Sequence, residues 1–368
     1  MANVFGNCIK LSIFGESHSD AIGVVLDGLP AGLPLDMDAV LAEMARRAPG
    51  QNRFSTPRKE ADAPKIVSGL FQGKTTGTPL CALIENTNTR SKDYQPELLR
   101  PAHADYTAFM RYHGFSDYRG GGHFSGRLTA PLVFAGAVLK PYLAAQGIEI
   151  FAHIKSLGKE KDAVFNTISP DIEAYRNIQN RELALLDENL IPSFAKVIDN
   201  AKENSDSVGG VIEALITGVP AGLGSPFFES VESRLSAMLF SVPAVKGVEF
   251  GTGFGITELF GSQANDAFCL EKGEIKTKTN HNGGINGGIT NGMPLSFSVA
   301  VKPTPSIAKP QQTVNIETQT EETIAIHGRH DPCIVPRAVC VIEAAATIVM
   351  ADLLLEAKTY AEPATERN

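Results

Sequence analysis

Three short segments, far apart in this 368-residue chain, place a histidine beside serine, aspartate, arginine or glycine. They are residues 15–19 (GESHS), 100–105 (RPAHAD) and 328–332 (GRHDP). Guanidinium groups offer a planar fork of donors that matches carboxylate and phosphate oxygens, and imidazole titrates near neutral pH. If the segments converge, they predict a pocket that binds a small polyanion and transfers protons.

A fourth segment, residues 119–127 (RGGGHFSGR), runs directly into an apolar stretch that is expected to form a helix. Consecutive glycines before a helix leave free backbone N–H groups at its start, and Arg127 adds a guanidinium there. This arrangement predicts an anion site. The alternative is a tightly turning loop that needs glycine only for its backbone conformation.

The two histidines nearest the N-terminus also have purely structural interpretations. His18 follows a predicted strand, where serine and aspartate commonly satisfy the backbone of a polar turn. The pattern of a nucleophile elbow is broken, because its fifth position is Ser19 instead of glycine. His103 follows Pro101 at an expected helix start, and the structural alternative is that it caps this helix and has no catalytic role.

Two further segments have a composition that is common where a protein contacts a ligand, although each also has a simpler interpretation. Residues 280–292 are too rich in glycine for regular structure and would let backbone approach a ligand, but they lack dinucleotide-binding spacing. A basic run after the first expected helix could equally be a solvated face. That run comprises Arg46, Arg47, Arg53, Arg58 and Lys59.

Composition excludes several classes of function. A net charge of −8 argues against nonspecific binding of nucleic acid. Five widely spaced cysteines without a CxxC pair favour reduced thiols in a cytoplasmic protein. No signal peptide is expected, because the N-terminus lacks a basic region followed by an apolar run. No membrane span is expected, because charges interrupt every long apolar run. No metal site is predicted, because paired-cysteine and HExxH spacings are missing from the sequence.

The elements that must position these residues do not alternate regularly between strand and helix. Apolar, β-branched runs predict strands at 9–14, 21–27, 65–71, 80–85, 148–154, 209–217 and 294–301. Helices are expected at 36–48, 102–113, 127–146, 192–204, 229–240 and 337–357. Irregular order favours a mixed α+β fold over a doubly wound parallel sheet.

One large domain spanning residues 1–368 is expected, because the histidine segments must converge and no linker separates them. The helices at 127–146 and 337–357 are apolar around most of their circumference, which predicts that both are central and buried. Residues 355–368 are expected to form a flexible tail. The polar stretch 158–206 is interpreted as a peripheral insertion carrying short helices.

At colinear spacing, the chain resembles the chorismate synthase family from Gly15 to about Asp352. The resemblance rests on the segments above together with residues 117–122 (DYRGGG), 247–251 (GVEFG), 283–292 and 302–306 (KPTPS). It implies central helices sandwiched between antiparallel sheets. It also implies a homotetramer.

The resemblance implies an elimination reaction. Phosphate and the C6 proton would leave 5-enolpyruvylshikimate 3-phosphate to give chorismate, the last common step of aromatic amino-acid biosynthesis. Reduced FMN would be required without net redox change. Since the chain has no room for an appended reductase, an external flavin reductant is expected, and NADPH is associated with the reaction.

The resemblance also assigns roles to individual residues. His18 would protonate the departing phosphate, His103 would protonate or stabilise the reduced flavin, and Asp331 would act near flavin N5. Substrate binding is implied for Ser17, Arg47, Arg53, Arg127 and Arg329. Cofactor binding is implied for Ser125, Gly126, Gly287, Gly288, Lys302, Ser306 and Arg329.

The chain departs from the family pattern at Ser19, at Ala102 and within residues 123–128, where His123, Phe124 and Leu128 replace the usual residues. Two alternative functions follow. One is a catalytically impaired homologue that still binds FMN or anions. The other is a phosphohydrolase that works without flavin.

Overall fold

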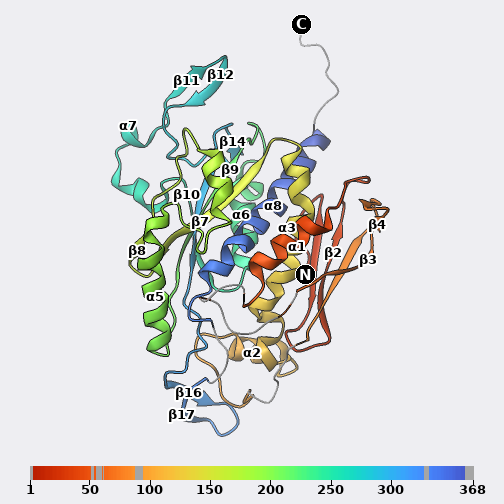
Figure 1. Ribbon diagram of the computed structural model, residues 1–368, viewed down its shortest axis with the longest axis vertical. Helices are drawn as coiled ribbons and strands as arrows, with labels where there is room; N and C mark the ends of the chain where they lie inside the picture. Colours follow the sequence, from red (N-terminus) through yellow and green to blue (C-terminus); the bar gives the residue numbers. More distant parts are fainter. Residues whose placement is uncertain are drawn as a thin grey trace.

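A layer of long helices lies between two antiparallel sheets in the computed structural model (Figure 1). The structure describes residues 3–50, 54, 60, 62–87, 94–326 and 331–360. One sheet has the strand order β1 (Lys10–Gly15), β2 (Ala21–Asp27), β6 (Leu80–Glu85) and β3 (Lys65–Ser68). The other has the order β10 (Val245–Phe250), β15 (Leu295–Val301), β9 (Gly210–Thr217), β7 (Glu149–Leu157) and β8 (Glu160–Lys161).

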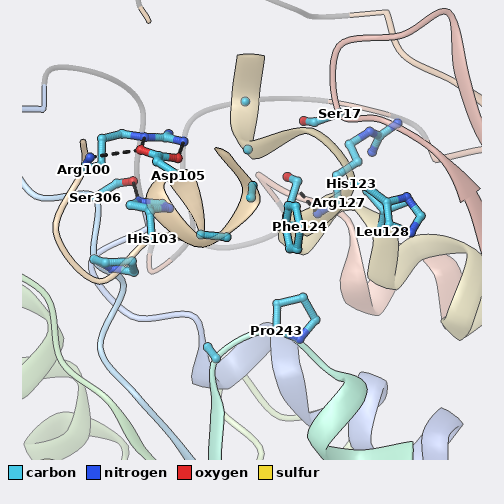
Figure 2. Close-up of a pocket in the computed structure, with 18 of the residues that line it drawn as sticks. Ser17, Arg100, His103, Asp105, His123, Phe124, Arg127, Leu128, Pro243 and Ser306 are labelled. Carbon is cyan, nitrogen blue, oxygen red and sulfur yellow. Dashed lines mark hydrogen bonds and ion pairs between the residues drawn. The ribbon is translucent and has the colours of Figure 1, made fainter. Parts of the chain in front are cut away.

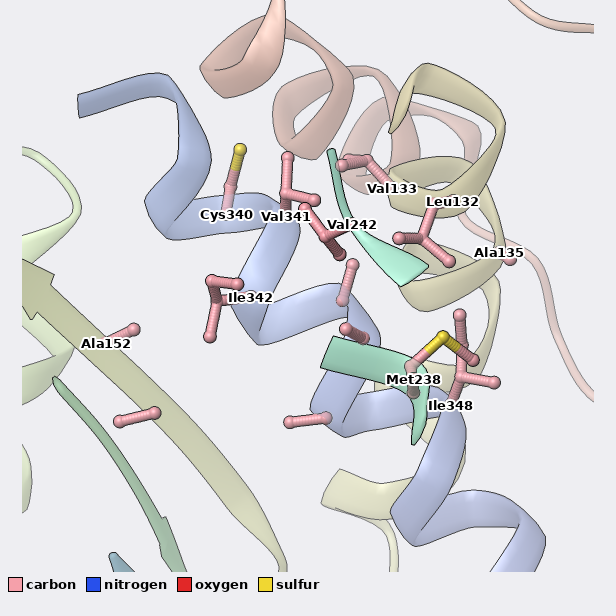
Figure 3. Packing of buried hydrophobic residues seen from close by; sticks show 14 of the residues in the cluster. Leu132, Val133, Ala135, Ala152, Met238, Val242, Cys340, Val341, Ile342 and Ile348 are labelled. Carbon is pink, nitrogen blue, oxygen red and sulfur yellow. The ribbon is translucent and has the colours of Figure 1, made fainter. Parts of the chain in front are cut away.

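Two helices form the centre of the molecule, as their all-round apolar sequences predict. Helix α3 (Thr129–Ala144) packs on the first sheet, and α8 (Val335–Tyr360) packs on the second. They approach so closely that a Cβ at Gly136 would lie 2.5 Å from Cβ of Ala344. Figure 3 shows the buried aliphatic side chains of this layer. The prediction of an α+β fold with helices between antiparallel sheets is therefore confirmed.

The remaining helices and strands surround this layer. The other helices are α1 (Met37–Arg47), α2 (Asp105–Tyr112), α4 (Ile172–Ile178), α5 (Ile191–Glu203), α6 (Val231–Ser241) and α7 (Gly261–Ala264). The short 3₁₀ segments are η2 (Arg119–Phe124), η3 (Gly126–Leu128), η4 (Glu188–Leu190), η5 (Phe227–Glu229) and η6 (Gly253–Glu258). Short paired strands are β4 (Leu70–Phe71) with β5 (Lys74–Thr75), β11 (Phe268–Glu271) with β12 (Glu274–Thr277), β13 (Ile285–Asn286) with β14 (Ile289–Thr290), and β16 (Gln311–Asn315) with β17 (Thr320–Ile324).

Some expected boundaries are wrong. Helix α2 begins at Asp105, so His103 lies in the turn before it and the N-cap is Ala104. Helix α8 continues to Tyr360, into the segment expected to be a tail, and residues 361–368 lie outside the described residues. By length and composition, Val335–Thr359 is apolar enough to cross a membrane, but most of it is buried inside the molecule.

Candidate active site

A cavity of about 1730 Å³ brings together segments that are far apart in the sequence. Figure 2 shows its wall, which is built from the turn after β1, the loop before α2, the glycine-rich segment and residues near 306. The predicted site residues that line it are Ser17, His18, Arg47, His103, Ser125, Gly126, Arg127, Lys302, Ser306 and Asp331. The convergence expected from the sequence therefore places both imidazoles and the carboxylate around one space.

Four predicted site residues are not placed in this cavity. Arg53 and Arg329 lie outside the described residues. Gly287 and Gly288 form the turn between β13 and β14, where the carbonyl of Gly288 accepts a hydrogen bond from Val231 N at 3.0 Å. These two glycines are not among the described residues that line the cavity, so their contact with a cofactor stays a prediction.

His18 is enclosed by backbone on one side and by an aromatic ring on another. The rings of His18 and Tyr94 are nearly perpendicular, with centroids 5.4 Å apart. A Cβ at Gly120 would lie 2.5 Å from Cδ2 of the imidazole and 2.6 Å from its Nε2. Gly120 also has a φ of +63°, which side chains disfavour. The glycine-rich segment is thus required for close approach of backbone to His18.

Asp117 supplies negative charge near His18. Hydrogen bonds from Arg119 lower the pKa of the Asp117 carboxyl, and the charge of His18 lowers it further. Asp117 thus places a negative charge beside the imidazole. Asp117 was not singled out from the sequence, although it belongs to the DYRGGG segment and lines the cavity.

The turn that carries His18 is tied to the glycine-rich segment on both sides. Ser17 is buried, and its N–H donates to the carbonyl of Gly122 at 3.1 Å. Nδ1 of His123 donates to the carbonyl of Gly15 at 2.8 Å. His123, one of the departures from the family pattern, thus holds the backbone of the turn in place.

His103 lies in a second polar group that lines the same cavity. It shares a hydrogen bond of 2.7 Å with Oγ of Ser306, and Nζ of Lys302 donates to the carbonyl of Ala102 at 2.7 Å (Figure 2 shows the first). Arg100 binds Asp105 through two side-chain hydrogen bonds of 2.8 and 2.6 Å. Arg100 also lies over the ring of Tyr94, 5.4 Å from its centroid, which connects the two histidine segments.

In this second group the Asp105 carboxyl is held ionised. Burial would raise the pKa of Asp105, but the hydrogen bonds and charge of Arg100 outweigh burial, and His103 also lowers it. Partial burial lowers the pKa of Lys302, and the neighbouring Lys246 lowers it further. Both lysines line the cavity and give this end a positive character.

The two predicted substrate-binding arginines within the described residues, Arg47 and Arg127, are both buried at the floor of the site. Asp62 lies between them and accepts hydrogen bonds from both guanidinium groups. Arg127 also pairs with Glu60 at 2.9 Å. Burial lowers the pKa of Arg47 to about 10; Arg337 and Arg127 contribute to the decrease, whereas Asp62 opposes it.

Asp331 is held by a residue that sequence reasoning missed. Nη1 of Arg337, in the first turns of α8, lies 2.5 Å from Oδ2 of Asp331. Nε of the same guanidinium donates to the carbonyl of Arg47 at 2.9 Å. Arg337 thus connects the candidate carboxylate with the end of α1. The only signal for it in the sequence is a single arginine near the start of a mostly apolar helix.

The cavity fits a flavin mononucleotide in its chemistry. Oγ1 of Thr304, in the KPTPS segment, is buried and has no hydrogen-bond partner among the described residues, although Thr304 lines the cavity. A ligand rich in hydroxyl and phosphate oxygens would supply that partner. Lys302 and Lys246 suit a phosphate, and the half-exposed ring of Phe124 offers an apolar surface to an aromatic ring system.

Fold and cavity together define an enzyme built to bind a small polyanion beside titratable side chains. The sequence model of the family described as chorismate synthase matches residues 9–355. This chain belongs to the chorismate synthase family and is a lyase that acts on a phosphate ester. The phosphohydrolase and the impaired homologue considered from the sequence gain no support.

Individual relatives agree with this assignment along the whole chain. The chain is 45% identical to chorismate synthase of Dehalococcoides mccartyi, covering 97% of this chain and 98% of that protein. It is 44% identical to chorismate synthase of Thermococcus kodakarensis, covering 96% and 98%. A crystal structure of chorismate synthase superposes with a TM-score of 0.77 at 30% identity, covering 96% of this chain and 93% of that one.

Proposed function

We propose that this cavity binds 5-enolpyruvylshikimate 3-phosphate together with reduced FMN and eliminates phosphate and the C6 proton to give chorismate. The observation that carries the proposal is the meeting of His18, His103, Asp331 and two buried arginines around one space. The substrate bears a phosphate and two carboxylates, which are groups that guanidinium forks such as those of Arg47 and Arg127 bind. When bound, reduced FMN supplies electron density to the reacting allylic system.

His18 is proposed as the proton donor to the departing phosphate. A general acid must hold a proton at the pH of the reaction, and the negative charge of Asp117 lies close enough to interact with the His18 ring. Gly120 and Tyr94 fix the ring, so the proton is presented in one orientation. Neutralising charge on the leaving phosphate lowers the barrier to its departure.

Arg47 and Arg127 are proposed to bind the anionic groups of the substrate, as are Ser17 and, from the family pattern, Arg53 and Arg329. Both described guanidinium groups lie in a largely buried setting, where charge–charge interactions are stronger than in water. Asp331, held by Arg337, places a carboxylate at the same cavity, where it can accept a proton. These residues orient the substrate and neutralise developing charge.

The cofactor end is proposed to comprise His103, Ser306, Lys302, Ser125 and Gly126, with Thr304 as a further hydroxyl. His103 and Ser306 already share a hydrogen bond, so the imidazole is oriented before a ligand arrives. Gly287 and Gly288 stay in the proposal on the family pattern alone. An external reductant in the cytoplasm, linked to NADPH, is proposed as the source of reduced flavin.

We further propose that the protein is a homotetramer. Several large apolar side chains are more than two-thirds exposed around η5, η6, α7 and the hairpin β11–β12, and α7 and the hairpin extend away from the body (Figure 1). These are Phe227, Phe228, Phe254, Phe260, Phe268 and Leu270. An exposed apolar set of this size is typical of a subunit interface.

Sedimentation velocity should give four times the chain mass for the wild-type protein, and Phe268→Ser should lower the measured mass. A wild-type protein that sediments as a monomer would reject the tetramer.

Turnover under anaerobic conditions tests the reaction. With substrate and dithionite-reduced FMN the protein should form chorismate, and with oxidised FMN or without flavin it should not. Equal rates in the three conditions would reject the flavin requirement. Absence of product in all three would reject the proposed reaction.

A further inference from the structure

We propose that Asp62 is a positioning residue that sets the orientation of both substrate-binding guanidinium groups. The inference rests on the proposed role of Arg47 and Arg127 in binding substrate. Asp62 itself is not among the described residues that line the cavity, and its side chain is fully buried. It therefore acts on the substrate only through the two arginines in front of it.

The carboxylate of Asp62 bridges arginines from separate elements. Oδ2 accepts a hydrogen bond from Nη1 of Arg47, at the end of α1, at 2.5 Å. Oδ1 accepts one from Nη1 of Arg127, in η3. Each carboxylate oxygen thus serves a different guanidinium. Asp62 thus bridges the two cations directly, and Glu60 adds a second carboxylate at Arg127.

The remaining donors show how completely each fork is constrained. Nε of Arg47 donates to Oγ1 of Thr129 at 3.1 Å, and its Nη2 donates to the carbonyl of Gly126 at 3.2 Å. Nε of Arg127 donates to Oδ1 of Asn86 at 2.7 Å. Because a guanidinium is planar and rigid, bonds at several of its nitrogens determine which edge faces the cavity.

The backbone at Asp62 indicates that this placement is specifically maintained. Its φ is +48°, in the left-handed region that non-glycine residues rarely adopt. Such a conformation persists when the surrounding contacts outweigh its cost. Burial would raise the pKa of the Asp62 carboxyl, but Arg47 and Arg127 outweigh burial and lower it. The carboxylate is therefore held ionised between its two partners.

Asp62 could act by position or by charge alone, and these two roles predict opposite results. If Asp62 only compensates charge, Asp62→Asn leaves more net positive charge at Arg47 and Arg127, and anions bind more tightly. If it positions the two guanidinium groups, the same substitution removes the charge-assisted bond that bridges them, their relative placement changes, and anions bind more weakly. We expect the second result: KM for substrate and Kd for inorganic phosphate should each rise about tenfold or more, since charge-assisted bonds at both arginines are lost.

A second variant keeps the charge and changes the geometry. Asp62→Glu lengthens the side chain by one methylene, so it cannot occupy the same bridge. The positioning role predicts weaker binding here too, whereas a pure charge role predicts wild-type behaviour. This variant also keeps the test decisive if Asp62→Asn fails to fold, because removing a carboxylate from two buried cations is strongly destabilising.

Glu43→Gln is the matched control. Glu43 also bridges two cations, Arg46 and Lys140, and is likewise held ionised, but it does not line the cavity. It should leave KM and phosphate affinity unchanged while lowering thermal stability. If Glu43→Gln weakened phosphate binding as much as the Asp62 variants, general destabilisation would explain their effect and the inference would fail.

Phosphate titration by calorimetry separates this inference from the proposed reaction. Weaker phosphate binding in both Asp62 variants supports positioning even if the wild-type protein forms no chorismate. Wild-type phosphate affinity and KM in a folded Asp62→Glu variant, or tighter binding in Asp62→Asn, would overturn it.

Discussion

At the scale of single residues, the site depends on contacts that leave little freedom to its titratable groups. His18 is enclosed by Gly120, Tyr94 and the charge of Asp117, and Asp331 is held by Arg337. Fixed orientation matters because proton transfer requires donor and acceptor to meet in one geometry. The chemistry is therefore sensitive to changes that leave the fold intact.

Removing either proposed proton-transfer group should slow turnover without unfolding the protein. His18→Ala and Asp331→Ala are each expected to lower kcat by about 10²–10⁴-fold, the usual contribution of positioned proton transfer. Anaerobic steady-state kinetics with reduced FMN measure the effect. Rates near wild type in both variants would remove these roles.

Gly120→Ala should impair catalysis through His18. Its Cβ would collide with the imidazole, so the ring must move, and we expect kcat to fall at least tenfold with a changed pH profile. Gly121→Ala is the matched control, because Gly121 also has a positive φ of +83° but its Cβ would meet only Ser125 Cβ at 3.9 Å. Equal losses in both variants would show that backbone strain, and not the contact with His18, is responsible.

At the scale of elements, the central helices position the site by packing against each other. Helix α3 follows η3, which carries Arg127, and α8 carries Arg337 in its first turns. Gly136 and Ala344 let the two axes approach closely. A shift between these helices would separate Arg127, which is proposed to bind substrate, from Arg337, which holds Asp331.

Gly136→Val should therefore lower the free energy of unfolding. A Cβ at this position would lie 2.5 Å from Ala344, and overpacking a core typically costs about 1–3 kcal/mol. Ala144→Val, at an exposed position of the same helix, controls for the propensity of valine. Denaturant unfolding should separate the two variants; equal midpoints would contradict the packing account.

Elements with strong periodicity could be predicted from the sequence, and short ones could not. The two central helices and the strands β1, β2, β6, β7, β9 and β15 lie where apolar patterns placed them. The strand β10 and the hairpins β11–β12 and β16–β17 were missed, because each is short or polar and is defined by its partner strand. His103 was expected inside a helix, but the helix begins only after the turn at Ala104.

Pairing of side chains was the least predictable part of the site. Arginines and histidines were identified by type and spacing, but Asp62 carries no local signal, and the signal for Arg337 is only that of a single arginine in a mostly apolar helix. Their roles exist only because α1, η3 and the start of α8 meet in space. The departures from the family pattern at His123 and Phe124 are likewise explained only by the structure. His123 donates a hydrogen bond to the carbonyl of Gly15, and Phe124 lines the cavity.

At the scale of the whole molecule, a buried ionic cluster ties the peripheral segment 158–206 to the second sheet. His153 in β7 lies between Asp162, at 3.1 Å, and Glu213 in β9, at 3.0 Å, and its side chain is fully buried. Burial would lower the pKa of His153, but hydrogen bonds to both carboxylates outweigh it and raise the pKa. Burial would raise the carboxyl pKa values of Asp162 and Glu213, but hydrogen bonds from His153 and from backbone N–H groups outweigh burial and lower both pKa values.

The cluster should make stability depend on pH. A raised histidine pKa contributes stability that is complete below about pH 6.5 and is lost as pH rises through the folded value. The lowered carboxyl pKa values contribute stability that is lost as pH falls below about 4. The difference in unfolding free energy between wild type and His153→Gln should thus be largest near pH 5–6 and shrink toward pH 8. A difference that grows with pH would contradict this assignment.

The claim on which everything else depends is that one cavity couples loss of phosphate to loss of the C6 proton. The most direct measurement is the ratio of phosphate released to chorismate formed, under anaerobic conditions with reduced FMN and substrate. We predict one chorismate for each phosphate, with both signals appearing at the same rate. Phosphate release that exceeds chorismate, or that proceeds unchanged when flavin is omitted, would contradict the account.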